Sequence, residues 1–443
     1  MARVVSIVSD LHLGGPPGFQ ITPPAAQRRL AAFVRRVAAQ PGSHLVLAGD
    51  VVDFLSESGD APFVGDEAAA TRHLDALVAR NREVFDAFAH AARTCDRFTV
   101  LLGNHDLELC LPSVRRAFVA ALGGGPIEFL YDNEALRVGP LLVEHGNRYD
   151  AWNVVDHDAL RRLRSTLSRA EAPAAFEPPV GSRLVVEVMN PIKARYPFVD
   201  VLKPENEAVL PLLGVLWPVS VAAIWRLNRL RKAKNRHRYD AETGAPVDVQ
   251  NIAALEDAQG EALALTQALA GGDADIGARE VLEGVARAWS DLPLDALRQA
   301  LRHLSAAQSR TFDPGVEAEP YLTAARTLLA GDAEVVVFGH THLVKHVALP
   351  GGVYLNSGTW ADLMRVPDDV FAADPARADA ALRDFVRRCD EDRLDGLRGS
   401  VPTFARVTLS DAGDRVMDCG VFVSPDADDA EPVRATAENT RPR

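Results

Sequence analysis

The segment VVSIVSDLHLG, residues 4–14, decides the fold of this chain. Its first five residues, Val4 to Val8, are mostly β-branched and apolar, which predicts a buried β-strand. Asp10 and His12 follow directly. Because side chains two residues apart in an extended segment point to the same side, these two can be aimed at one point. The segment therefore predicts a polar site at the carboxyl end of a strand.

Four further segments repeat this arrangement of an apolar run followed by Asp, Asn or His. They are LAGDVVD (47–53), LLGNHD (101–106), VEHGN (143–147) and VFGHTH (337–342). Each segment alone is a weak signal, since Asp and His also form turns. Sheets that contain parallel strands carry function at the carboxyl ends of those strands. We therefore expect the candidate ligands to meet at one edge, and they are Asp10, His12, Asp50, Asn104, His145, His340 and His342.

The first third of the chain alternates predicted strands with predicted helices. Strands begin at Val4, His44 and Arg97, and helical patterns cover residues 26–40 and 66–93. This βαβαβ order predicts a parallel sheet with crossover helices, and hence an α/β fold. Short strands follow residue 126, and strands return from residue 334 onward.

The candidate ligands combine carboxylates, imidazoles and one amide oxygen. This set suits manganese, iron or zinc, with manganese preferred, and it lacks the thiolates of a structural zinc site. These seven candidate ligands are too many for one ion. Two divalent ions about 3.5–4 Å apart, bridged by one carboxylate, would clamp the attacking and leaving oxygens of a phosphoryl displacement and generate hydroxide near neutral pH.

With these motifs, the sequence resembles the calcineurin-like metallophosphoesterase superfamily. The motifs D-x-H, G-D-x-x-D, G-N-H-D/E, H and G-H-x-H occur here in the family's order, over residues 1–150 and 331–423. The resemblance implies a four-layer αββα sandwich. It implies that one ion binds Asp10, His12, Asp50 and His342. The second ion would bind Asn104, His145 and His340 and share Asp50 as the bridge.

The resemblance also implies roles beyond the ligands. His105 would lie over the phosphate, as a proton donor to the leaving oxygen or a stabiliser of transition-state charge. Asp106 is expected to orient His105, and Asp53 to support the loop. The segment NSGTW, residues 356–360, is expected to support the GHTH loop. Four weaker candidates for substrate contacts are Arg148, Tyr149, Lys345 and His346.

Composition narrows the partners and the compartment. The 443 residues are 47% hydrophobic, enough for a large core, and the net charge of -13 argues against nucleic acid as a partner. The four cysteines have no paired spacing, which favours a reducing compartment. The N-terminal apolar run is too short for a secretory signal. We therefore expect a cytoplasmic protein, with contact to the inner face of the membrane as an option.

The expected core comprises residues 1–151 and 331–423, separated by a helical insertion, 152–330, and followed by a disordered tail, 424–443. Within the insertion, Ala208 to Trp225 is eighteen residues without a charge, and a basic cluster follows up to Arg238. A single membrane crossing there is excluded, because it would separate His145 from His340, which ligate the same ion in the expected centre.

Residues 208–238 then have three interpretations: a helical cap on the core, an interfacial element at a membrane surface, and a dimer contact. A basic cluster in an acidic protein attracts phosphate-bearing ligands, so the expected substrate is a phosphorylated small molecule or lipid, with a nucleotide-linked lipid included. We predict a dinuclear metal-dependent hydrolase of phosphomonoester, phosphodiester or pyrophosphate bonds. The alternatives are a non-catalytic binding scaffold on the same fold and a nuclease.

Overall fold

The structure is a computed structural model that describes residues 3–17, 19–57, 61–193, 197–203, 310–425 and 431–441. The segment 208–238 lies outside the described residues, and so do its three interpretations. Within the described ranges, no helix combines the length and the apolar character that a membrane crossing requires.

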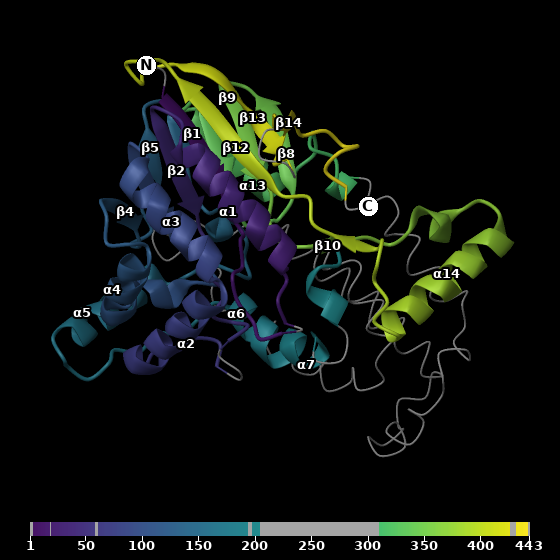
Figure 1. Ribbon diagram of the computed structural model, residues 1–443, viewed down its shortest axis with the longest axis horizontal. Coiled ribbons are helices and arrows are strands. Elements are labelled where there is room, and N and C mark those ends of the chain that lie inside the picture. Colours follow the sequence, from purple (N-terminus) through teal and green to yellow (C-terminus); the bar gives the residue numbers. More distant parts are fainter. Residues whose placement is uncertain are drawn as a thin grey trace.

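Seven strands form the larger sheet, in the order β14, β13, β12, β1, β2, β3, β4 (Figure 1). Strands β1 to β4 pair in parallel, which confirms the predicted parallel sheet, whereas β12 runs antiparallel to β1. The strands of this sheet are β1 (Arg3–Val8), β2 (Ser43–Ala48), β3 (Arg97–Leu101), β4 (Ile127–Leu130), β12 (Thr403–Leu409), β13 (Val416–Val423) and β14 (Val433–Arg434).

Five strands form the second sheet, in the order β5, β6, β7, β9, β8. Its central strands β6, β7 and β9 are parallel, and β5 and β8 add antiparallel edges. These strands are β5 (Leu136–Val138), β6 (Leu141–Val143), β7 (Val335–Phe338), β8 (Val344–Leu349) and β9 (Gly352–Ser357). A separate antiparallel pair joins β10 (Leu363–Met364) to β11 (Arg398–Gly399).

Helices begin and end where the sequence supplies suitable terminal residues. The side chain of Asp66 accepts a hydrogen bond from Ala69 N and so satisfies one of the free amides at the start of α2. The single helix expected over residues 66–93 is two helices, because the chain breaks at Asn81, whose side-chain amide donates to Leu77 O at 2.8 Å. The α-helices are α1 (Pro24–Ala38), α2 (Glu67–Arg80), α3 (Arg82–Thr94), α4 (Pro112–Ala121), α5 (His157–Ser168), α6 (Val180–Leu184), α7 (Asn190–Lys193), α13 (Glu319–Leu329) and α14 (Pro375–Asp390). Short 3-10 helices are η1 (Leu107–Cys110), η2 (Asn147–Tyr149), η4 (Pro197–Asp200) and η7 (Asp368–Phe371), and η3 (Val185–Met189) is a π-helix.

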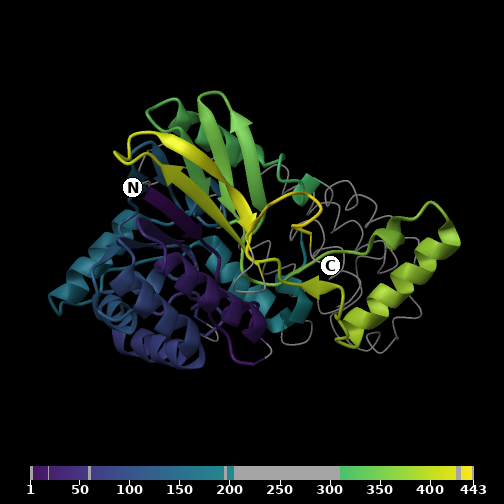
Figure 2. The same cartoon turned by 45° about the horizontal axis from the view of Figure 1, so that its top comes forward.

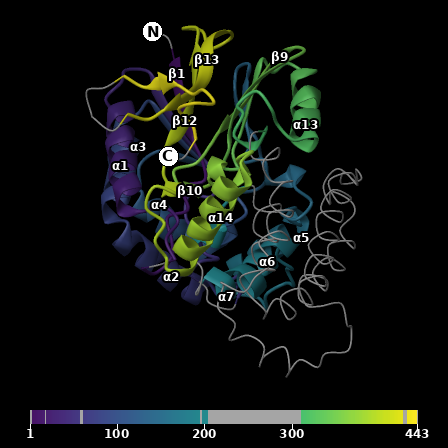
Figure 3. The same ribbon diagram turned by 90° about the vertical axis from the view of Figure 1, so that its right-hand side faces the viewer.

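The two sheets pack face to face, with helices on both outer faces (Figure 3). Strand β2 shows how alternation builds the layers. Leu45 and Leu47 join the cluster under α1 and α3, whereas Val46 and Ala48 join the cluster between the sheets. On the far side, α13 covers the outer face of the second sheet. The predicted four-layer αββα sandwich is confirmed.

A further apolar cluster lies beside the sandwich and includes α14 (Figure 2). There Phe198 and Leu202, from the described start of the expected insertion, share a cluster with Leu382 and Phe385 of α14. The boundaries at residues 151 and 330 remain predictions, although α5 and α13 pack on the core from inside the expected insertion. The expected tail differs in part, since β14 pairs with β13.

Candidate metal centre

The five loops expected to carry ligands come together where the carboxyl ends of parallel strands from both sheets meet. Each ligand lies two to four residues beyond a strand, namely Asp10 and His12 after β1, Asp50 after β2, Asn104 after β3, His145 after β6, and His340 and His342 after β7. Side chains in this region form two groups made only of expected ligands and a third, His12, Asp50 and His105, that overlaps both. Within each group the possible ligand atoms lie within 4.8 Å of one another. This position agrees with the expected edge.

Asp10, His12 and His342 form the first group. His342 Nε2 is 3.0 Å from His12 Nε2 and 3.5 Å from Asp10 Oδ1. Ligand atoms that each lie about 2.1 Å from one ion are about 3 Å from one another, so this spacing fits a cation. Burial, together with the positive charge of Lys203, lowers the pKa of His342 well below its usual value. Its ring is therefore neutral, which is the form that binds metals.

Asp50, His145 and His340 form another group. Asp50 Oδ2 is 3.2 Å from His145 Nε2 and 3.8 Å from His12 Nε2, so this carboxylate lies between the two groups. His145 Nδ1 donates to Ala48 O at 2.8 Å, which turns Nε2 toward Asp50. Burial alone would lower the pKa of His145, but the charge of Asp50 raises it to about 9. Metal binding at this ring must therefore displace a proton.

Four buried atoms of expected ligands have no hydrogen-bond partner in the part of the chain that the structure describes. They are Asp10 Oδ1, His12 Nδ1, Asn104 Oδ1 and His145 Nε2. A buried polar atom without a partner costs about 1–3 kcal/mol, and such atoms are rare in folded proteins. Bound cations would satisfy atoms of this kind. The residues therefore fit a metal centre, and their oxygen and nitrogen donors suit manganese, iron or zinc.

The backbone at these loops is strained. Among the described residues, eight that are not glycine have positive φ, and five of those eight are expected ligands. The left-handed region costs such residues on the order of 1 kcal/mol or more each, and strain of this kind collects at functional sites. The five φ values run from 42° to 68°, at Asp10, His12, Asp50, His340 and His342.

Two glycines let the loops approach this closely. Gly49 has a φ of 88°, and a Cβ placed there would lie 2.5 Å from His145 Nδ1. A Cβ on Gly103 would lie 2.1 Å from Asp50 Oδ1. Any larger residue at either position would therefore displace a ligand.

His105 lies beside the two groups, and its ring is held differently from the expectation. Its Nδ1 lies 3.2 Å from Asp53 Oδ1, so Asp53 is the carboxylate that orients the ring. The carboxylate of Asp106 instead accepts hydrogen bonds from Gly103 N at 2.7 Å and Val51 N at 2.8 Å. The two aspartates thus exchange the roles expected from the sequence. Asp106 supports the loops and does not contact the His105 ring through a hydrogen bond in the described structure.

The same carboxylates control the charge of His105. Burial lowers its pKa, but the negative charges of Asp53 and Asp50 outweigh burial and raise the pKa to about 10. Burial and the charge of Asp50 also raise the pKa of Asp106 to about 7. Before any cation binds, the His105 ring is therefore positively charged at neutral pH, with a proton on both nitrogens. Its side chain is 20% exposed.

Comparison with known families agrees with this geometry. Residues 4–178 match the family described as calcineurin-like phosphoesterase. The chain carries a calcineurin-like phosphoesterase domain. The matched region contains the loops after β1, β2, β3 and β6, and the loop after β7 completes the same centre from outside it.

No curated protein matches this chain. Among solved structures, the chain is similar to a Staphylococcus aureus protein whose description names a 5'-nucleotidase in complex with alpha-ketoglutarate, at 14% identity and a TM-score of 0.30. The match covers 96% of this chain and 54% of the other, so the chain spans about half the length of that protein.

The segment NSGTW holds the GHTH loop of the phosphoesterase domain in place. Asn356 Nδ2 donates to Gly339 O at 2.6 Å and to Thr341 Oγ1 at 3.1 Å. Thr359 Oγ1 donates to Asp10 O at 2.7 Å, which ties the same segment to the first ligand loop. The supporting role predicted for residues 356–360 is confirmed.

Of the weaker candidates, Lys345 and His346 lie elsewhere. The ammonium group of Lys345 is buried and donates to Thr311 O at 2.7 Å and Asp313 O at 3.1 Å, so it is a structural contact. His346 lies near Arg434 and Asp418, on the side of β13 and β14. The structure therefore does not bring these two side chains to the metal centre, where the sequence led us to expect them. Both residues lie on β8, which pairs with β9. The sequence alone does not tell which face of this strand is turned toward the site.

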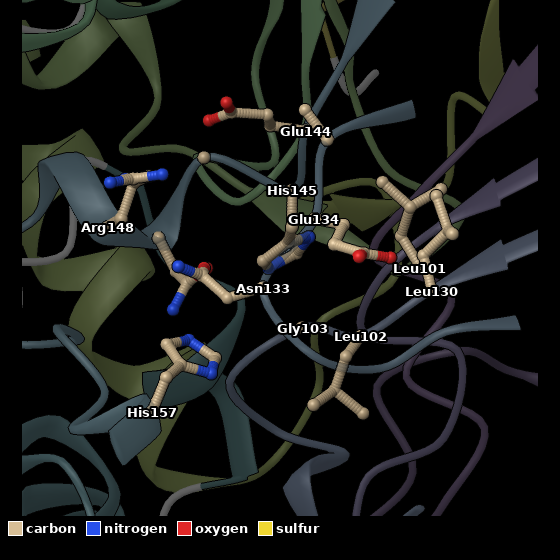
Figure 4. Close-up of a pocket in the computed structure, with 13 residues that line it drawn as sticks. Leu101, Leu102, Gly103, Leu130, Asn133, Glu134, Glu144, His145, Arg148 and His157 are labelled. Atoms are coloured by element: carbon tan, nitrogen blue, oxygen red, sulfur yellow. The ribbon is translucent and has the colours of Figure 1, made fainter. Parts of the chain in front are cut away.

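Arg148 and Tyr149 lie next to the centre. Tyr149 stacks on Phe338 with ring centroids 5.1 Å apart, and its hydroxyl donates to Glu144 at 2.9 Å. Arg148 lines a small pocket of about 40 Å³ that also includes His145 and His157 (Figure 4). Arg148 therefore shares a pocket with one expected ligand, and its contact with a substrate stays a prediction.

Sequence patterns missed three residues near the ligands. Lys203, at the last described position before residue 310, is buried, and its charge acts on His342. Asp150 and Asn153 contact His340 and Asn104. None of the three belongs to a motif of the family, and the only available signal was the spacing of Asp150 from His145 in EHGNRYD.

Proposed function

We propose that the chain is a two-metal hydrolase of phosphoric esters. The observation that carries this proposal is the position of Asp50 between two groups of ligands, with unpartnered buried donor atoms in both. A single carboxylate shared by two sites is the arrangement expected for a pair of ions that act on one phosphoryl group. Membership of a metal-dependent family supports the same conclusion.

When bound, the metal pair supplies an activated water and neutralises charge on the phosphate. The chain itself holds the ligands, excludes bulk water from them by burial, and presents His105. Asp53 fixes His105 Nδ1, which leaves Nε2 to donate a proton to the leaving oxygen or to bind a phosphoryl oxygen. Bound cations would lower the pKa of His105 from about 10 toward neutrality, where it works best as an acid.

The substrate class follows from charge. A net charge of -13 repels anions from the protein as a whole, so a phosphate must be attracted locally. Lys203 supplies positive charge beside His342. We propose a phosphomonoester, phosphodiester or pyrophosphate substrate, on a small molecule or on a lipid- or nucleotide-linked carrier, hydrolysed with manganese in the cytoplasm. The basic segment 208–238 motivates the lipid option from the sequence.

The test is hydrolysis of p-nitrophenyl phosphate and bis-p-nitrophenyl phosphate by the full chain with manganese. We expect the substitutions Asp50→Asn and Asn104→Ala each to reduce kcat/KM by at least about 100-fold, because catalysis that depends on precise positioning is lost when a ligand is removed. Asp86→Asn, at an exposed ion pair on α3, is the control and should keep full activity. Full activity of Asp50→Asn would refute the proposal.

Two outcomes would point to the alternatives. A wild-type chain that binds manganese but hydrolyses neither substrate, nor any of a panel of phospholipids, nucleotides and nucleotide-sugars, would favour a binding scaffold. Cleavage of DNA would favour a nuclease. Hydrolysis that rises only with vesicles present would select a lipid-linked substrate.

A further inference from the structure

The segment that follows His145 contacts two other expected ligands of the metal centre. It forms the 3-10 helix η2 and the turn up to residue 153, and it presents two polar side chains, Asp150 and Asn153. Neither side chain was expected to take part in the site. Each contacts a different expected ligand of the second ion.

Asp150 fixes the protonation of His340. Its Oδ2 lies 3.1 Å from His340 Nε2. An ionised carboxylate only accepts hydrogen bonds, so Nε2 carries the proton and Nδ1 keeps its lone pair. His340 can then use only Nδ1 as a ligand atom.

Asn153 fixes the orientation of Asn104. Asn153 Nδ2 donates to Asp150 Oδ2 at 2.7 Å, so its Oδ1 is free to face Asn104. Asn104 Nδ2 lies 3.4 Å from that oxygen. With its amide nitrogen directed at Asn153, Asn104 keeps its oxygen, which is buried and has no hydrogen-bond partner among the described residues, for a cation.

The turn that carries these two side chains is itself well held. Asp150 Oδ1 accepts from Trp152 N at 2.9 Å, and Asn147 Nδ2 donates to Asn153 O at 2.9 Å. Gly181, in α6, packs against the turn so closely that a Cβ there would lie 2.2 Å from Asn153 Oδ1. The two side chains therefore have little freedom to turn away.

We propose that Asp150 and Asn153 are positioning residues for the second metal ion. Through a continuous chain of contacts from His340 to Asn104, they determine which atom of each ligand faces the ion. This inference rests on the proposed function, because it assumes that the second group binds a metal. Outer partners of metal ligands commonly contribute about 10–100-fold to metal affinity.

The experiment measures manganese binding by calorimetry in the full-length wild type and in Asp150→Asn and Asn153→Ala. We expect two ions to bind the wild type, and one of the two to bind about 10–100-fold more weakly in each variant. Asp158→Asn, an exposed carboxylate on α5, is the matched control and should bind both ions as the wild type does. Two ions bound with wild-type affinity in both variants would overturn the inference alone, and a wild type that binds fewer than two would overturn the proposed function.

A second readout does not depend on metal. Nitrogen chemical shifts of the His340 ring in the metal-free chain should show a proton on Nε2 in the wild type and a shift toward the other tautomer in Asp150→Asn. A merely structural role would leave the tautomer unchanged. An unchanged tautomer in a folded Asp150→Asn variant would contradict the role given to Asp150.

Discussion

A buried carboxyl near the centre should make the fold less stable as pH rises. Glu108 lies in η1, just after the GNHD motif, and only 2% of its surface is exposed. Its Oε1 accepts a hydrogen bond from Val64 N at 2.9 Å. Burial raises its pKa from 4.5 to about 8, with hydrogen bonds opposing the shift and the charges of Asp106 and Asp53 adding to it.

The sign of the effect follows from proton binding. Between pH 4.5 and about 8 the folded state holds a proton that the unfolded state has lost, so the free energy of unfolding falls as pH rises. Each pKa unit corresponds to about 1.4 kcal/mol, so the full shift sets an upper limit of about 5 kcal/mol. Relaxation around the charged form reduces this, and we expect a loss of about 2–4 kcal/mol between pH 5 and 8.5.

Glu108→Gln removes this titration but keeps an oxygen for Val64 N. We expect the variant to match the wild type at pH 5 and to be about 2–4 kcal/mol more stable at pH 8.5. Urea denaturation with a chelator present, followed across this pH range, measures the difference. Glu83→Gln, at an exposed position of α3, controls for the loss of a carboxylate. A difference between Glu108→Gln and the wild type that does not change with pH would refute the reasoning.

Three further predictions concern other positions. Gly103→Ala should reduce kcat/KM more than about 10-fold, since the added Cβ would displace the Asp50 carboxylate. Gly65→Ala, whose Cβ meets only ordinary contacts, is the control and should keep the wild-type kcat/KM. Lys345→Met should destabilise the fold by about 1–3 kcal/mol, because its ammonium group serves two backbone carbonyls, while kcat/KM of the folded variant stays near wild type. Burial and the charge of Arg97 lower the pKa of His44 from 6.5 to about 4. Between these pH values the unfolded state binds a proton that the folded state does not, so the free energy of unfolding should fall as pH drops from 6.5 to 4. Acid unfolding curves of His44→Gln should show a weaker dependence on pH.

The arrangement of the ligands was predictable from local patterns. Apolar strands that end in Asp, Asn or His predicted both the parallel order of β1 to β3 and the edge where the loops meet. The carboxyl ends of parallel strands lie together whatever the length of chain between them, which is why His145 and His340 could be placed at one site across a long insertion.

The side chains around the ligands were not predictable in the same way. Asp106 follows His105 in the same loop and Asp53 lies in the loop after β2, and only three-dimensional packing decides which of them contacts the His105 ring. Asp150 and Asn153 act through a turn that no periodic pattern marks. Lys345 lies on a predicted strand, but alternation along a strand does not say which face meets the site.

The measurement that tests the central claim most directly is electron paramagnetic resonance of the chain loaded with manganese. If Asp50 bridges two ions about 3.5–4 Å apart, the spectrum should be that of a spin-coupled pair in the wild type. The Asp50→Asn variant should lose the coupling, and the exposed Asp86→Asn control should keep it. A wild-type spectrum of isolated manganese ions, at a stoichiometry of one or two per chain, would contradict the account.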